Sequence, residues 1–137
     1  MVERTTIQET SDGIYAAWNA HAPAAVAAFY NEDAEVIDSS GIATRGRTAL
    51  RVLWAGRLMG FPDLRLHRTN LVVEANTSAD SWRLHATQTG EYDGLPPSGR
   101  RVEIVGASFT ESNEQGLVVR DTVYSNVLGF LSQLGVE

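Results

Sequence analysis

Acid and base chemistry in this sequence depends on carboxylates. The chain has no cysteine, and its three histidines, His21, His67 and His85, lack the paired spacing of metal ligands. Asp38 and Asp121 are the two acids that we consider as catalytic groups. A carboxyl group at the mouth of an apolar pocket has its pKa raised by desolvation, so it can accept a proton from a carbon acid near neutral pH. We therefore expect acid–base chemistry that needs no metal and no cofactor.

Each of these acids also has a structural interpretation. Asp121 follows Arg120 and could pair with it, or with another arginine near the surface, as acids on strands often do. Asp38 precedes the segment 39–41, Ser-Ser-Gly, where an aspartate side chain commonly hydrogen-bonds the backbone of a turn. We keep both interpretations of each residue.

Six further side chains are candidates for substrate binding. Four are aromatic and lie in or beside helical segments, where the alternative role is packing in the core. Two are neutral amides, which can hydrogen-bond substrate oxygens but cannot act as bases near pH 7. The six residues are Tyr15, Trp18, Trp54, Phe61, Gln88 and Asn126. An aromatic lining of this kind fits a flat polycyclic ligand.

The elements that must position these residues change from helical to strand-like periodicity along the chain. Apolar residues recur at helical spacing over residues 5–30, with a break at 19–23, and again from Thr48 to a stop at 60–63. A short strand is predicted at 34–39. Longer strands are predicted at 64–73, 81–92, 101–112 and 117–126, and an amphipathic helix at 128–134. Helices followed by a meander of strands predict an α+β fold, in which a curved antiparallel sheet and the helices enclose a pocket.

Composition limits the class of protein. The chain has 137 residues, 43% hydrophobic and 20% charged, which fits one globular domain over residues 1–137. A net charge of -6 without a stripe of basic residues argues against nucleic acid. We interpret the cluster Arg45, Arg47, Arg51 and Arg57 as a solvated helix face. The lack of a long apolar segment, of a signal-like start and of cysteine predicts a cytoplasmic protein that does not bind membranes.

Four blocks of sequence resemble the SnoaL-like polyketide cyclases, which have the cone fold of nuclear transport factors. The blocks are YAAWNAH at 15–21, FPDLR at 61–65, GEYDGLPPSGR at 90–100 and LGFLSQLG at 128–135. The resemblance implies a cone-shaped α+β barrel whose sheet wraps around the N-terminal helices. It also implies ring closure of a polyketide in secondary metabolism such as antibiotic biosynthesis. Family habit further implies a homodimer or homotetramer that pairs through the open face of the sheet.

The resemblance also implies where catalytic groups should lie. The family's histidine on the penultimate strand would fall at Ser108 or Phe109, and its aspartate on the last strand would fall at Val123. Because side chains alternate across a strand, Asp121 would face the pocket one inward step away. Asp38 falls where the family has the aspartate of a His-Asp-Pro motif.

Three functions follow as hypotheses. The leading one is a cofactor-independent, aldol-type cyclase with Asp121 as the acid–base group and Asp38 as a second candidate. The next is a hydroxylase-type relative, some of which share the amide at Asn126, or an epoxide hydrolase with an Asp–Arg–Asp relay built from Asp38, an arginine and Asp121. The last is a small-molecule binding protein that has lost catalysis, because Val123, Ser108 or Phe109, and Gln88 replace polar family residues.

Overall fold

Four helices cover the concave face and one end of the fold. A computed structural model of the chain describes residues 1–136. The helices are α1 (Arg4–Asn19), α2 (Pro23–Ala27), α3 (Arg47–Gly60) and α4 (Val127–Gln133). Pro23 takes the first position of α2, where its missing N–H has no intrahelical acceptor to lose. Gly46, and not the expected Thr48, precedes α3, so the predicted start of this helix was slightly late.

The strands form one curved sheet. They are β1 (Tyr30–Ile37), β2 (Ala43–Arg45), β3 (Arg65–Glu74), β4 (Thr77–Thr87), β5 (Arg101–Ser112) and β6 (Val118–Ser125), in the spatial order β2-β1-β6-β5-β4-β3. The antiparallel meander from β3 to β6 confirms the prediction from sequence. Two features were not predicted. Strand β2 pairs with β1, and β1 runs parallel to β6, so the sheet is mixed at this edge.

The start of β4 corrects the sequence analysis in a way that matters for the site. The expected strand began at Ser81, but β4 begins at Thr77 and ends at Thr87. Ala75 adopts a left-handed conformation with a φ of 53°, which makes a tight turn between β3 and β4. The polar residues after this turn belong to the strand, and Asp80 is one of them.

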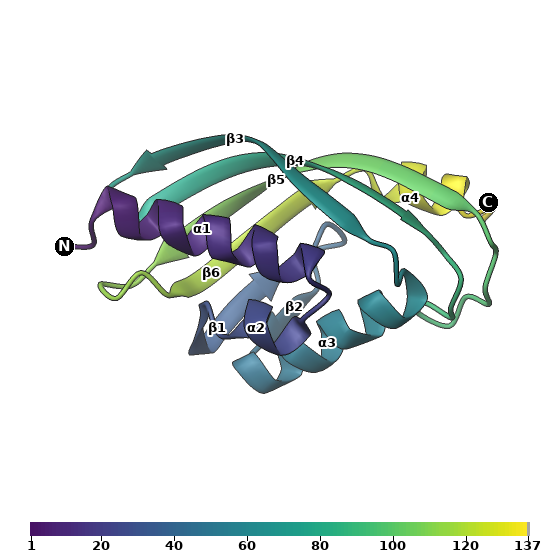
Figure 1. The fold of residues 1–137 in the computed structure, drawn as a ribbon, viewed down its shortest axis with the longest axis horizontal. Coiled ribbons are helices and arrows are strands. Elements are labelled where there is room, and N and C mark those ends of the chain that lie inside the picture. The colour runs from purple at the N-terminus through teal and green to yellow at the C-terminus, as the bar shows by residue number, and fades with distance from the viewer. Residues whose placement is uncertain (137) are drawn as a thin grey trace.

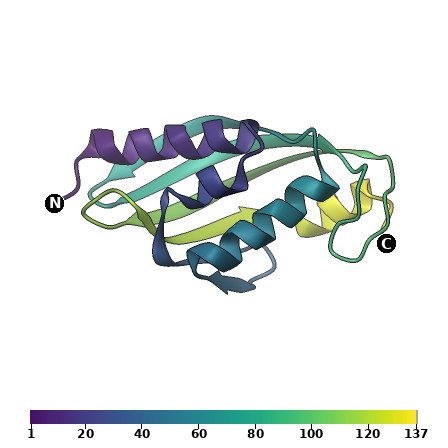
Figure 2. The ribbon, with the colours of Figure 1, turned by 60° about the horizontal axis from the view of Figure 1, so that its bottom comes forward.

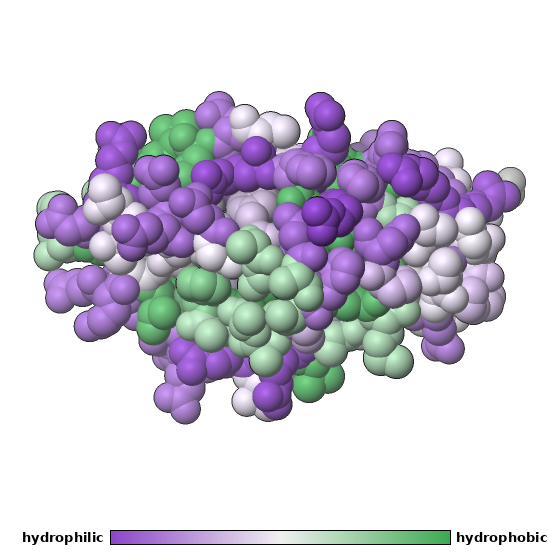
Figure 3. Space-filling view, in the orientation of Figure 1, coloured by the Kyte–Doolittle hydropathy of each residue, from purple (hydrophilic) through white to green (hydrophobic). Residues whose placement is uncertain are grey.

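The sheet arches over α1, while α2 and α3 close the side next to β1, and α4 lies at the end of β6 (Figures 1 and 2). Aromatic rings hold the helices on the sheet. The ring centroids of Trp18 and Trp54 are 5.6 Å apart, and those of Tyr30 and Trp54 are 4.9 Å apart. Figure 3 shows moderately hydrophobic side chains gathered around α2, the alanine-rich helix, with hydrophilic residues around them. Within residues 1–136, no helix is long and apolar enough to cross a membrane.

Motif residues fasten α1 to the sheet edge. The side chain of Asn19 accepts a hydrogen bond from the Leu66 N–H and donates one to the Leu66 carbonyl, each 2.8 Å long. The His21 Nε2 atom lies 2.8 Å from the Leu64 carbonyl oxygen. Downstream, the Asp63 carboxylate accepts a bond of 2.7 Å from the N–H of Thr87. These polar residues of the first two sequence blocks therefore serve the fold.

Candidate active site

A cavity of about 400 Å³ lies between the concave face of the sheet and the helices. Small-molecule sites have volumes of roughly 300–1,000 Å³, so this one has room for a small organic ligand. Trp18, Trp54 and Phe61 line it and are also buried in the hydrophobic core. Both roles that the sequence suggested for these three residues are therefore compatible with their positions. Tyr15 lines the cavity from α1.

Inward-facing residues of β4, β5 and β6 lie in rows across the sheet. Asp80, Ser108 and Val123 are direct neighbours in one row. The family's histidine was expected at Ser108 or Phe109 and its aspartate at Val123; Ser108 and Val123 line the cavity, whereas Phe109 is exposed. The next row brings Thr110 beside Asp121. The acids of this chain are thus displaced from the expected pair by one strand in one case and by one row in the other.

Asp121 lies in the wall of the cavity with 8% of its surface exposed. The Tyr30 hydroxyl donates a hydrogen bond of 3.1 Å to its Oδ2 atom, and the Thr110 hydroxyl donates one of 3.4 Å to Oδ1. Burial, followed by the nearby charge of Asp80, raises the pKa of Asp121 to about 7, although both hydrogen bonds favour the ionised form. Near neutral pH this carboxyl group therefore exists in both protonation states.

Asp80 is the acid that the sequence analysis did not identify. It lies on β4, lines the same cavity and accepts a hydrogen bond from the Tyr15 hydroxyl. Burial raises the pKa of Asp80, while the bond from Tyr15 and the charge of Arg68 act in the opposite direction. Arg68 itself is held by Asp12 at 2.8 Å and by the Ser11 hydroxyl at 2.8 Å. The alternation of side chains would have pointed to Asp80 if the strand had been started at Thr77.

The site therefore contains two pairs of tyrosine and aspartate, Tyr15 with Asp80 and Tyr30 with Asp121. Burial and the adjacent carboxylate raise the pKa of each phenol well above its usual value, so both hydroxyl groups stay protonated and donate. A carboxyl group with a pKa near 7, beside neutral hydroxyl donors, has the properties of a general acid or base. The charge of Asp80 also disfavours the ionised form of Asp121, which favours a proton on Asp121.

Asp38 lines the cavity but also stabilises a turn. Its Oδ1 atom accepts hydrogen bonds from the N–H groups of Ser40 at 2.9 Å and Ile42 at 3.0 Å. The Oδ1 atom of Asp38 therefore has the turn-stabilising role that the sequence suggested. In the part of the chain that the structure describes, neither Asp38 nor Asp121 forms an ion pair with an arginine. The Asp–Arg–Asp relay that we considered from sequence is therefore not assembled.

Gln88 and Asn126 are placed away from the cavity, contrary to expectation. The Gln88 amide is almost fully buried and donates to the carbonyl oxygens of Leu95 at 3.3 Å and Pro96 at 3.1 Å. Asn126 caps α4, where its Oδ1 atom accepts a bond of 2.8 Å from the N–H of Gly129. Neither is among the described residues that line the cavity, and we assign neither to substrate binding.

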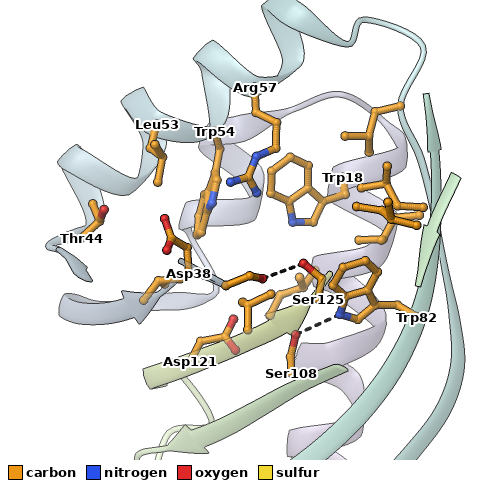
Figure 4. Close-up of a pocket in the computed structure, with 18 of the residues that line it drawn as sticks. Trp18, Asp38, Thr44, Leu53, Trp54, Arg57, Trp82, Ser108, Asp121 and Ser125 are labelled. Atoms are coloured by element: carbon orange, nitrogen blue, oxygen red, sulfur yellow. Dashed lines mark hydrogen bonds between the residues drawn. The ribbon is translucent and has the colours of Figure 1, made fainter. Parts of the chain in front are cut away.

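Figure 4 shows the arrangement of the remaining polar groups. The hydroxyl oxygens of Ser39 and Ser125 lie 2.7 Å apart. Figure 4 shows Ser125 in the space between Asp38 and the Trp82 ring. The guanidinium of Arg57, on α3, points into the cavity. The sequence analysis had placed this arginine on a solvated helix face. Arg57 follows the buried Trp54 by three residues, and this helical spacing places its side chain next to the Trp54 side of α3.

A family model and similar solved structures both relate this chain to SnoaL-like proteins. A family model described as a SnoaL-like domain matches residues 12–121. AclR from Streptomyces galilaeus, provisionally named a hydroxylase, is 23% identical with a TM-score of 0.84, covering 97% of this chain and 98% of AclR. A protein of Jannaschia sp. CCS1, provisionally named a SnoaL-like polyketide cyclase, is 22% identical with a TM-score of 0.87, covering 97% and 94%.

A third similar structure belongs to an enzyme that is named for a different reaction. SalBIII, an epoxide hydrolase/cyclase-like enzyme of pyran ring formation in the polyether salinomycin, is 15% identical with a TM-score of 0.79, covering 94% of this chain and 97% of SalBIII. At these identities the likeness establishes the fold, and the chemistry must be argued from the site. No curated protein matches the sequence.

Proposed function

We propose, given that this chain belongs to the SnoaL-like family, that it is a cofactor-independent enzyme of polyketide or related secondary metabolism, such as antibiotic biosynthesis. The reaction is an aldol-type ring closure or a related modification of a flat, polycyclic substrate. One observation carries the proposal: Asp121, in the wall of an apolar cavity, has its pKa raised to about 7. A base with that pKa can remove a proton from carbon and return it within one cycle.

In this mechanism the ionised Asp121 accepts a proton from a carbon next to a substrate carbonyl. The resulting enolate carbon forms a bond to a second carbonyl carbon of the same molecule. The oxygen of that carbonyl gains a proton, which the protonated Asp121 or the Asp80–Tyr15 pair supplies. Because Asp80 and Asp121 line one cavity, one of them can hold a proton while the other is ionised.

The first test measures proton abstraction without requiring the natural substrate. 2-Tetralone is a flat bicyclic ketone with acidic hydrogens next to its carbonyl, and NMR in heavy water follows their exchange. We expect the wild-type protein to accelerate this exchange and Asp121→Asn to lose about 10²- to 10⁴-fold, the usual contribution of a general base. The wild-type rate should rise as pH increases through 7, because Asp121 must be ionised to accept the proton.

A matched variant controls for the general loss of a carboxylate. Asp33 is exposed on β1, away from the cavity lining, so Asp33→Asn should exchange at the wild-type rate. An Asp121→Asn protein with undiminished exchange would exclude Asp121 as the base. Exchange by the wild type no faster than in buffer would remove the support for carbon-acid chemistry at this site.

A second candidate function is hydrolysis of an epoxide by a water molecule that Asp121 activates. The fold likeness to SalBIII favours it, together with the presence of two acids in one cavity. Incorporation of ¹⁸O from labelled water into a diol product would distinguish it from ring closure. The non-catalytic alternative corresponds to saturable binding of 2-tetralone without exchange.

Self-association of this enzyme as a homodimer or homotetramer is part of the proposal. Three large apolar residues are exposed on β5 and β6, namely Val105, Phe109 and Tyr124. They lie on the face opposite to that of Ser108 and Asp121, since side chains alternate along each strand. Light scattering of the purified chain measures this directly, and a monomer at all concentrations would exclude it.

A further inference from the structure

Arg57 brings a positive charge into a cavity that is otherwise lined by apolar, hydroxyl and acidic side chains. It is the one lysine or arginine among the described residues that line the cavity. Its guanidinium points inward between the rings of Trp54 and Trp18, and the guanidinium carbon lies 6.0 Å from the centre of the Trp18 ring (Figure 4). The side chain is half-buried on α3, one turn after Leu53 at the cavity rim.

The protein itself does not neutralise this charge. The ion pairs formed by residues 1–136 involve Arg45, Arg68, Arg101 and Arg120, and none of them includes Arg57. Neither does Arg57 donate a side-chain hydrogen bond within that part of the chain, whereas Arg47, ten residues earlier, donates two to the Tyr30 carbonyl. A guanidinium kept in an aromatic pocket without a carboxylate is available to a ligand, and its planar fork matches a carboxylate.

We propose that Arg57 binds a carboxylate of the ligand, so that the cavity selects flat aromatic or polyketide-type acids over neutral analogues. The inference rests on the proposed function for its choice of ligand, since it names the substrate class of the same cavity. Trp18 and Trp54 flank the guanidinium and provide ring surfaces for the apolar body of such an acid. An acid held at Arg57 extends toward the opposite wall, where Asp121 lies.

The acidic residues of the lining do not prevent this binding. Asp121 has its pKa raised to about 7 and that of Asp80 is also raised, so both carry less negative charge than exposed acids. The Oδ1 atom of Asp38 accepts hydrogen bonds from two backbone N–H groups. Asp93 lies in the exposed loop at the rim. The guanidinium is therefore the group in the cavity that can attract an anion.

Calorimetric titration with two unreactive probes of the same shape tests the proposal. The probes are 2-naphthoate, which is anionic near neutral pH, and 2-naphthamide, which is neutral. We expect the wild type to bind 2-naphthoate more tightly. Arg57→Met should weaken that binding by about 10- to 100-fold, the contribution of a charge-assisted hydrogen-bonded pair, and leave 2-naphthamide binding unchanged. Arg57→Lys should retain part of the preference for 2-naphthoate, because lysine keeps the positive charge but lacks the two parallel N–H donors of the guanidinium.

Arg51 provides the matched control, because it is exposed on the same helix and does not line the cavity. Arg51→Met should bind both probes as the wild type does. Circular dichroism melting of each variant verifies that α3 remains folded. Equal affinity of the wild type for the two probes, no binding of either, or an Arg57→Met protein that keeps the preference would overturn the proposal. These measurements involve no turnover, so their failure is distinct from a failure of proton abstraction at Asp121.

Discussion

Replacement of Asp121 by asparagine should stabilise the protein at alkaline pH while it removes activity. Asp121 has an ordinary pKa of 3.8 when unfolded and a pKa of about 7 in the folded chain. Between these values the folded state binds more protons than the unfolded state, so the free energy of unfolding falls as pH rises. A difference of roughly three pKa units corresponds to about 4 kcal/mol at about 1.4 kcal/mol per unit. An amide cannot ionise, so Asp121→Asn avoids this loss.

Urea unfolding of the wild type and of Asp121→Asn, measured from pH 4 to pH 8.5, isolates the contribution of this residue. The difference in unfolding free energy should grow in favour of the variant from about pH 4 upward and level off above about pH 8, reaching a few kcal/mol. Carboxylates that do not interact with Asp121 titrate alike in both proteins, so their contributions to the difference cancel. A difference that does not change with pH would show that Asp121 is not desolvated as the structure indicates.

Three more substitutions test the hydrogen bond to Asp80 and the packing of the sheet and of α3. Tyr15→Phe removes the hydroxyl that donates to Asp80, so the pKa of Asp80 should rise further and 2-tetralone exchange should fall about tenfold; an unchanged pH–rate profile would contradict this role. Gly106→Ala should destabilise the chain by about 1–3 kcal/mol in urea unfolding, because a Cβ there would lie 2.4 Å from the Trp82 ring and 2.7 Å from the Tyr124 carbonyl oxygen. Gly56→Ala on α3 meets open space and should be neutral or stabilising, and equal effects of the two alanines would exclude the packing explanation.

The fold was largely predictable because periodicity reports which face of an element is buried. Leu50, Trp54 and Leu58 recur at helical spacing and are buried on α3 as expected. The parallel pairing of β1 with β6 was not predictable in the same way. It depends on where the chain returns in space, and β1 carries no local signal for its partner. The short strand β2 was missed for a similar reason, since three residues contain no measurable alternation.

The site was predicted in part, and the omissions have physical causes. Asp121 was found because the alternation of β6 could be counted from a family position. Asp80 was missed because Thr77 and Ser78, polar residues after a turn, were assigned to a loop although they pair with β5. Gln88 was expected in the cavity, but carbonyl groups of the loop that follows β4 satisfy its amide, and such non-local partners cannot be read from sequence.

The pairing of β1 with β6 has a consequence for how the protein folds. The register joins Tyr30 to Val118 and Val36 to Asp121, residues from opposite ends of the chain. Contacts this distant in sequence form slowly, because closing a long loop costs entropy before any contact compensates it. The hydrogen bond from Tyr30 to Asp121 belongs to the same junction. The environment that raises the pKa of Asp121 therefore forms only when the first and last strands have met, and proton uptake by this carboxyl group would serve as a kinetic marker of the completed sheet.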